Sequence, residues 1–225
     1  MRTPKLLIVA IRGNRGVDEV NRSANGIYNK YSNRTEFNKQ VELAYLSRSG
    51  NLVEGEGKGA LDLNEGDVLG MYIVAHSGDL QTAIYDHDFV SAFKTKILDV
   101  KSNGVNYTLD KLCLVVCNTA KGAEDILTNS HEGVLIFRFA KLLQSAGLKP
   151  RLAGWSGLVT ADEESGYANS TQRGTGKKQI ISSRNFQWGY ASEMPRSKAE
   201  QKMVYVWDDE AGYVKRDLRS WTDKG

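Results

Sequence analysis

Five apolar segments with strand-like patterns divide the first 160 residues of the chain. The first, KLLIVAI at 5–11, is a continuous run rich in β-branched residues between Pro4 and Gly13, which is typical of a strand buried on both faces. Segments of a similar kind predict further strands at 41–47, 67–75, 111–117 and 151–157.

Helical patterns lie between these segments. A polar helix is predicted at 17–31, a second near 86–98, and a longer one at about 131–146 that ends at Gly147. The glycine-rich stretch at 50–59 is interpreted as a flexible hairpin or loop. Strands that alternate with helices predict an α/β fold with a mostly parallel sheet covered on both sides.

The pattern changes after about residue 160. Glycines and polar residues surround short strand-like segments, and MVYVWDDEAGYVKRDL at 203–218 predicts a hairpin whose turn is at 208–212. We therefore divide the chain into an α/β core at 1–160 and a C-terminal β subdomain at 161–225. The two parts are expected to pack together as one structural unit.

The composition is that of a globular protein. Of the 225 residues, 40% are apolar and 25% are charged, which is ordinary for a soluble domain. The longest apolar runs are about seven residues, against the roughly 20 that a membrane-spanning helix needs, so no membrane span is expected. The amino-terminal apolar run has no small-residue cleavage site after it, and we interpret it as a strand rather than a signal peptide. Cys113 and Cys117 are expected to be free thiols.

Positive charge is concentrated between residues 173 and 202. The net charge of the whole chain is only +3, but this segment has seven basic and two acidic residues. The cations either spread over a solvated surface or converge on a polyanion, and both interpretations stay open. No nucleic-acid partner is expected. The candidate polyanion-binding residues are Arg173, Lys177, Lys178 and Arg184.

Two of the predicted strands end at reactive side chains. His76 follows the strand at 67–75, and Cys117 closes the strand at 111–117. Because catalytic groups of open α/β sheets collect outside the carboxyl ends of the strands, both side chains are expected at the same edge. A thiol hydrogen-bonded to imidazole can ionise near neutral pH, and the imidazolium can then protonate a leaving amine. The candidate oxyanion hole consists of the backbone N–H groups of Ser77, Gly78 and Cys117.

Packing is the alternative role for a cysteine in an apolar strand. Free cysteine is among the most buried residue types, and Cys113, flanked by leucines, fits that role. Cys117 differs because the polar sequence NTAKG follows it directly. His87 and His131 are interpreted as surface or capping residues, and no second group of ligands supports a metal site.

The spacing of these residues resembles a known family. A hydrophobic strand that ends in histidine, followed 41 positions later by a cysteine that ends a second strand, is similar to the caspase-like cysteine peptidases of clan CD. The chain resembles in particular the autoprocessing cysteine protease domain of large bacterial toxins, of the MARTX and clostridial glucosylating types. The segments at 139–166 and 204–212 also resemble the later helix, strands and acidic turn of that domain.

The resemblance implies a cysteine endopeptidase with a caspase-like sheet, in which Cys117 is the nucleophile and His76 is its partner. The family histidine is usually followed directly by glycine, whereas Ser77 precedes Gly78 here. Family members bind inositol hexakisphosphate on a basic surface of the β subdomain, which implies an allosteric activator, while the chemistry itself requires no cofactor or metal. Some members have an aspartate that orients the histidine, and the sequence does not assign its counterpart.

The resemblance also implies a biological setting. We expect a monomeric toxin or effector that is secreted without a recognisable signal peptide or delivered to a host cytosol. Its substrate is a polypeptide, cut in cis or in trans; since the first predicted strand begins at about residue 5, we expect an excised domain or cleavage in trans. Two alternatives stay open. One is a catalytically silent caspase-like module that binds an anion or a partner, which Ser77 favours, and the other is a CHAT or caspase-like protease of the bacterial cytoplasm without inositol phosphate dependence.

Overall fold

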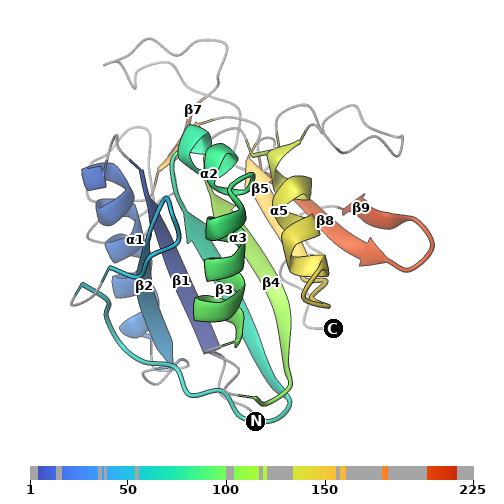
Figure 1. Cartoon of the computed structure of the whole chain (residues 1–225), viewed down its shortest axis with the longest axis horizontal. Coiled ribbons are helices and arrows are strands. Elements are labelled where there is room, and N and C mark those ends of the chain that lie inside the picture. The colour runs from blue at the N-terminus through green and yellow to red at the C-terminus, as the bar shows by residue number, and fades with distance from the viewer. Residues whose placement is uncertain are drawn as a thin grey trace.

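A seven-stranded sheet forms the centre of the molecule (Figure 1). The computed structural model describes residues 5–13, 17–34, 37, 40–53, 56–99, 104–116, 119–120, 134–155, 158–160, 179–181 and 202–216. The strands of the sheet are β1 (Lys5–Arg12), β2 (Val41–Ser47), β3 (Asp67–Val74), β4 (Tyr107–Val115), β5 (Arg151–Trp155), β8 (Lys202–Asp208) and β9 (Gly212–Arg216).

The order of the strands is β2-β1-β3-β4-β5-β8-β9. Strands β1 to β5 are parallel, β8 is antiparallel to β5, and β9 is antiparallel to β8. The predicted α/β fold with a mostly parallel sheet is therefore confirmed. A separate two-stranded antiparallel sheet consists of β6 (Leu158–Thr160) and β7 (Gln179–Ile181).

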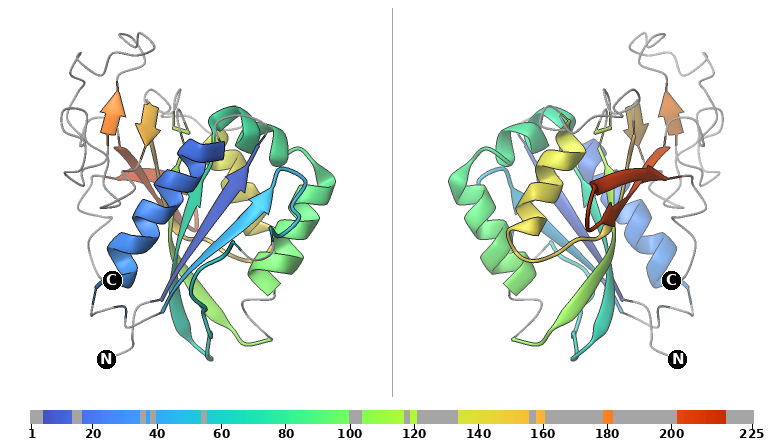
Figure 2. Two further views of the ribbon diagram at one scale, coloured as in Figure 1. Left: turned by 90° about the vertical axis from the view of Figure 1, so that its left-hand side faces the viewer. Right: turned by 90° about the vertical axis from the view of Figure 1, so that its right-hand side faces the viewer.

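Helices cover both faces of the sheet (Figure 2). Helix α1 packs Val20, Ala24 and Ile27 on one face, together with Ile8 of β1 and Val115 of β4. The other helices pack on the opposite face, where Leu80, Phe89 and Phe139 join the larger apolar cluster. The helices are α1 (Val17–Ser32), α2 (Ser77–Ala83), α3 (His87–Phe93), the π-helix η1 (Lys94–Asp99) and α5 (Leu135–Gln144).

The predicted elements differ from the structure mainly at their ends. The helix expected near 86–98 consists of α3 and η1, and it begins after Asp86, whose carboxylate accepts hydrogen bonds from the backbone N–H groups of Asp88 (2.9 Å) and Phe89 (3.4 Å). An N-cap of this kind satisfies helix donors that otherwise have no partner. Helix α5 begins at Leu135, and residues 131–133 lie outside the described part of the chain.

Strand β4 begins four residues earlier and ends two residues earlier than the predicted strand at 111–117. Its register against β3 shifts between Leu69 and Gly70, so that Asp110 is an extra residue in the strand. Two nitrogens of Arg151 donate hydrogen bonds to the Asp110 carboxylate at 2.6–3.1 Å. This partner stabilises a charged residue at a bulge that the local hydrophobic pattern does not predict.

The predicted hairpin at 203–218 exists as β8 and β9, but it continues the core sheet rather than forming part of a separate β sheet. Burial of apolar side chains holds the hairpin on the core sheet, since Val204 and Tyr205 are 1% and 2% exposed where β8 pairs with β5. The Tyr213 hydroxyl donates to the carbonyl of Pro150 (3.0 Å), which ties β9 to the start of β5. The rest of the expected subdomain at 161–225, apart from β7, lies largely outside the described residues.

Candidate active site

The carboxyl ends of the parallel strands form one edge of the sheet, which we call the carboxyl edge. The strand order places β1 between β2 and β3, so the chain direction along the sheet reverses between β1 and β3. In open α/β sheets, ligands bind at such a reversal, outside the carboxyl ends of the strands. His76 follows β3 by two residues and therefore lies at this position.

His76 joins β3 to α2. It is the N-cap residue of α2 with extended backbone angles (φ −75°, ψ 144°), and its carbonyl accepts from the N–H of Leu80 at 3.0 Å. Its side chain makes no capping hydrogen bond to the helix and is 34% exposed. The imidazole is thus placed by its backbone, while its ring is left accessible for other contacts.

A carboxylate from α1 lies beside the His76 ring. The distance between His76 Nε2 and Glu19 Oε2 is 3.8 Å, and the Glu19 side chain is 52% exposed. This distance is that of an ion pair when the imidazole is protonated, and it is too long for a direct hydrogen bond. Sequence analysis did not identify Glu19. The sequence signal that could have identified Glu19 was its position in the first turn of the helix after β1. That turn lies at the same sheet edge as the end of β3.

The register between β3 and β4 places the ends of these two strands side by side. The last pair is Val74 with Val115, and both side chains belong to the apolar cluster on the α1 face. His76 and Cys117 each follow this pair by two residues in the chain. Cys117 itself lies outside the described residues, so its pairing with His76 stays a prediction.

Ser77 and Gly78, the predicted oxyanion-hole residues, are the first two residues of α2. A side-chain carbon at Gly78 would meet no atom within 4 Å, so open space lies next to this backbone. At Gly13 the situation is reversed, because a side-chain carbon there would lie 1.9 Å from the Asp79 carboxyl group. A residue with a side chain at position 13 would therefore displace the Asp79 carboxyl group, which lies against the end of β1. The role of the Ser77 and Gly78 N–H groups stays a prediction.

The end of β1 has a network of polar contacts next to this site. Arg12 stacks over the ring of Tyr45, with 4.1 Å between the guanidinium carbon and the ring centroid, and its Nε donates to Asn21 Oδ1 at 2.7 Å. It also forms an ion pair with Glu56 and donates a hydrogen bond to the Glu56 carboxylate. This hydrogen bond holds the pKa of Glu56 below its ordinary value. The Arg12 side chain is 14% exposed, and its guanidinium group contacts Glu56, Asn21 and Tyr45.

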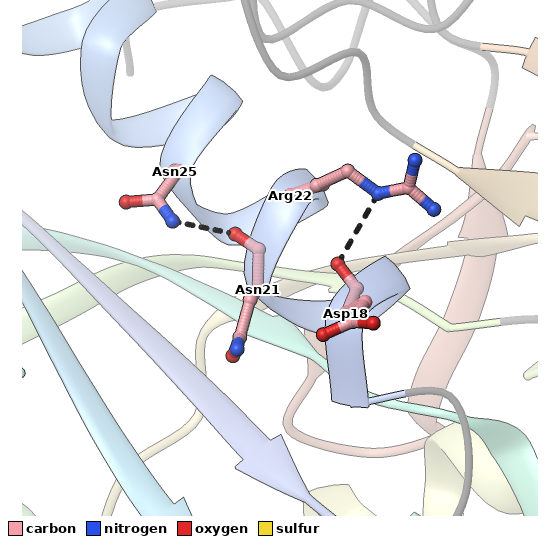
Figure 3. Close-up of a pocket in the computed structure, with 4 residues that line it drawn as sticks. All are labelled: Asp18, Asn21, Arg22 and Asn25. Carbon is pink, nitrogen blue, oxygen red and sulfur yellow. Dashed lines mark hydrogen bonds between the residues drawn. The ribbon is translucent and has the colours of Figure 1, made fainter.

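A polar pocket of about 430 Å³ lies along α1 (Figure 3). It begins at the first turn of the helix, where the Nε of Arg22 donates to the carbonyl of Asp18 at 3.4 Å. The Nδ2 of Asn25 donates to the carbonyl of Asn21 at 2.9 Å, and the Asn21 side chain contacts Arg12. The pocket is thus connected to the polar network at the end of β1. Its lining residues are Asp18, Asn21, Arg22 and Asn25.

Cys113 has the packing role that the sequence predicts. It is fully buried in β4, opposite Tyr72 of β3 and Ala153 of β5. Its thiol belongs to the apolar cluster beneath α1, where a substrate has no access. His87 is 95% exposed at its side chain and is the first residue of α3, in agreement with a surface role.

Several other predicted residues lie where the structure gives no description. Arg173, Lys177, Lys178 and Arg184 lie outside the described residues, so their convergence on a polyanion stays a prediction. Within the described ranges, no group of three or more potential metal ligands occurs. No described helix is long and apolar enough to cross a membrane.

No protein-family model and no curated protein matches the chain.

Proposed function

We propose that the chain is a cysteine endopeptidase of the caspase-like type, in which Cys117 is the nucleophile and His76 is its acid–base partner. The observation that carries this proposal is the β3–β4 register. Because Val74 pairs with Val115 in parallel strands, the chain leaves both strands at the same level, and His76 and Cys117 follow at equivalent positions. Neighbouring strands are about 4.8 Å apart, which is a suitable separation for a thiol and an imidazole to meet.

The proposed reaction has two stages. The Cys117 thiolate attacks the carbonyl carbon of the scissile peptide bond, and the negative charge moves to the carbonyl oxygen. Collapse of this intermediate breaks the C–N bond as the His76 imidazolium gives its proton to the leaving amine. Water, deprotonated by the neutral imidazole, then hydrolyses the thioester and restores the thiol. The N–H groups of Ser77, Gly78 and Cys117 are the proposed donors to the oxyanion.

Glu19 supports this mechanism as a residue that acts through His76. Its carboxylate lies 3.8 Å from Nε2, within ion-pair distance of the imidazolium that forms in the proposed reaction. Because both side chains are partly exposed, solvent screens this interaction and its contribution is small. We therefore propose Glu19 as a positioning residue, in place of the orienting aspartate of some family members.

The ionisation of Cys117 tests the proposed function. The measurement is the alkylation rate of each cysteine by iodoacetamide between pH 5 and 10, followed by peptide mass spectrometry. We expect Cys117 to react with an apparent pKa below the ordinary thiol value of about 8.5, while buried Cys113 stays unlabelled. In His76→Ala the Cys117 profile should return to the ordinary value. An ordinary profile in the wild-type protein, unchanged by His76→Ala, would contradict the dyad.

A digest of a mixed peptide library tests the peptidase reaction itself. Wild-type protein should cut peptides at a defined motif, and Cys117→Ala should cut none. Cys113→Ala is the matched control, since it removes the buried thiol from the same strand; it should cost on the order of 1 kcal/mol of stability and retain cleavage. An activated Cys117 without any cleavage would instead favour the silent binding module.

The basic segment leads to a second proposal, which rests on sequence alone. We propose that inositol hexakisphosphate binds Arg173, Lys177, Lys178 and Arg184 and activates a toxin-type or effector-type peptidase. The phosphate should raise the melting temperature and speed Cys117 labelling, both less so at high salt. Reversal of Lys177 and Lys178 to Glu should remove the response. An active peptidase that gives no response would instead favour a bacterial CHAT-type protease.

A further inference from the structure

The two outermost strands of the seven-stranded sheet differ in how their outer sides are covered. At one end, the chain after β2 folds back along it, and Leu46 forms an antiparallel bridge with Leu52. Leu43 forms a second bridge with Lys58, whose N–H donates to the Leu43 carbonyl at 3.0 Å. At the other end, β9 pairs with β8 on its inner side, and within the described residues no strand pairs with its outer side. Because an uncovered outermost strand pairs readily with another strand, the outer side of β9 is a surface for strand addition.

Opposite charges lie at the two ends of β9. The turn before the strand is acidic, and Asp209 and Glu210 are exposed there. Asp208 holds this turn, since its carboxylate accepts from the backbone N–H of Glu210 at 3.0 Å. Lys215 and Arg216, at the carboxyl end of the strand, are also exposed. The right-hand view of Figure 2 shows that the β8–β9 hairpin faces outward at this end of the sheet.

This charge distribution is complementary to itself in an antiparallel arrangement. A two-fold axis through Val214, the central residue of β9, pairs the whole strand with a second copy. Lys215 then lies opposite Tyr213 of the partner copy, and Arg216 lies opposite the partner's Gly212, next to the acidic turn. The symmetry forms each of these contacts twice. A parallel arrangement would instead place like charges side by side, which is unfavourable.

We propose that β9 is the interface with a second copy of this chain, in which two β9 strands pair antiparallel about Val214 and join the two sheets into one. This inference does not depend on the proposed function, and it puts a dimer in place of the monomer that the resemblance implies. A five-residue strand on each side makes a small interface. We therefore expect a weak dimer, with a dissociation constant on the order of 100 µM.

Two charge reversals at opposite ends of the interface test this proposal by sedimentation at low salt. Arg216→Glu puts a negative charge beside the partner's acidic turn, and Glu210→Lys puts a positive charge beside the partner's Arg216. Each variant alone should dimerise at least tenfold more weakly than wild type. An equal mixture should restore the dimer, because both ends of the mixed pair then bring opposite charges together. Lys94→Glu is the control: it reverses an exposed charge in η1, and it should keep the wild-type dissociation constant.

Amide hydrogen exchange of the wild-type protein shows whether the dimer uses β9, even if a variant does not fold. The amides of β9 should exchange several-fold more slowly at 1 mM protein than at 10 µM, while those of β2 should not change. The proposal is overturned if the wild-type protein stays monomeric up to 1 mM. It is also overturned by a dimer whose β9 amides keep the exchange rates of the monomer, or by two folded variants that stay monomeric when mixed. None of these results bears on the ionisation of Cys117, so the proposed function is tested separately.

Discussion

The two edges of the parallel sheet have the same kind of charged pair in different surroundings. At the amino edge, Lys5 Nζ lies 2.7 Å from Asp67 Oδ2, and the two side chains are 7% and 12% exposed. At the carboxyl edge, His76 Nε2 lies 3.8 Å from Glu19 Oε2, and the exposures are 34% and 52%. The amino-edge pair is closed and desolvated, whereas the carboxyl-edge pair is open to solvent.

Additional contacts increase this difference. Asp67 also accepts from the N–H of Asn64 at 2.7 Å, and Lys5 donates to the carbonyl of Asp62, so the amino-edge pair is held in one geometry. His76 makes no capping bond with its side chain. Removal of one partner from a buried pair of this kind is destabilising, while a partly exposed imidazole can exchange protons and meet a substrate. Substitutions at the two edges should therefore have opposite consequences for activity and stability.

The largest effect is expected for His76→Ala. Loss of the acid–base partner should lower kcat/KM for peptide cleavage by roughly 10²- to 10⁴-fold. The melting temperature should stay within about 2 °C of wild type, because the side chain is partly exposed and caps nothing. His87→Ala, at a 95% exposed histidine, is the matched control and should retain full activity. Equal losses in both variants would remove the distinction on which the site depends.

Lys5→Met tests the amino edge. Removal of the ammonium leaves the Asp67 carboxylate buried without its partner, which should lower the free energy of unfolding by about 3 kcal/mol. The activity of the folded fraction should stay at the wild-type level, since the change lies at the opposite end of the strands. Urea unfolding and peptide cleavage measure the two quantities. A stable variant with impaired cleavage would mean that the edges do not act separately.

Acid should weaken the amino edge. The hydrogen bond from Lys5 holds the pKa of Asp67 below its ordinary value. A carboxyl group whose pKa is lower in the folded state stabilises the protein above its unfolded pKa of about 3.9, and this stabilisation is lost as the pH falls through the folded value. The unfolding free energy of the wild-type protein should thus fall more steeply below about pH 4 than that of Asp67→Asn. Parallel curves would show that Asp67 is not responsible.

The smallest effect is expected for Glu19→Gln. Solvent screens the pair with His76, so kcat/KM should fall only about two- to fivefold. Asp88→Asn is the matched control, because Asp88 lies 3.7 Å from the exposed ring of His87 in α3. An unchanged kcat/KM in Glu19→Gln would remove Glu19 from the mechanism.

Local patterns predicted most of the elements, and long-range contacts account for what they missed. The run at 5–11 predicts β1 because both of its faces are buried. The hairpin turn at 208–212 predicts β8 and β9, but no local signal shows that β8 pairs with β5, whose partner residues are about 50 positions away. The bulge at Asp110 depends on Arg151 in the next strand, which a local pattern does not contain.

The same division applies to the candidate site. His76 was identified because a strand pattern ends directly before it, which is a local signal. Its neighbour Glu19 comes from a helix two strands earlier in the chain and meets it only through the sheet order. Thr119 was visible only as part of a polar sequence after Cys117. Its buried hydroxyl accepts a hydrogen bond from the N–H of Trp155, a long-range contact that the local sequence does not contain.

A crystal structure of the wild-type protein tests the central claim most directly. The measurement is the separation between the Cys117 sulfur and the nearer ring nitrogen of His76. The account predicts a separation within about 4 Å, on the α1 face of the sheet, with the Thr119 hydroxyl bonded to Val116 and Trp155 as it is here. A separation beyond about 7 Å, with both side chains ordered and no segment able to close it, would contradict the proposed dyad.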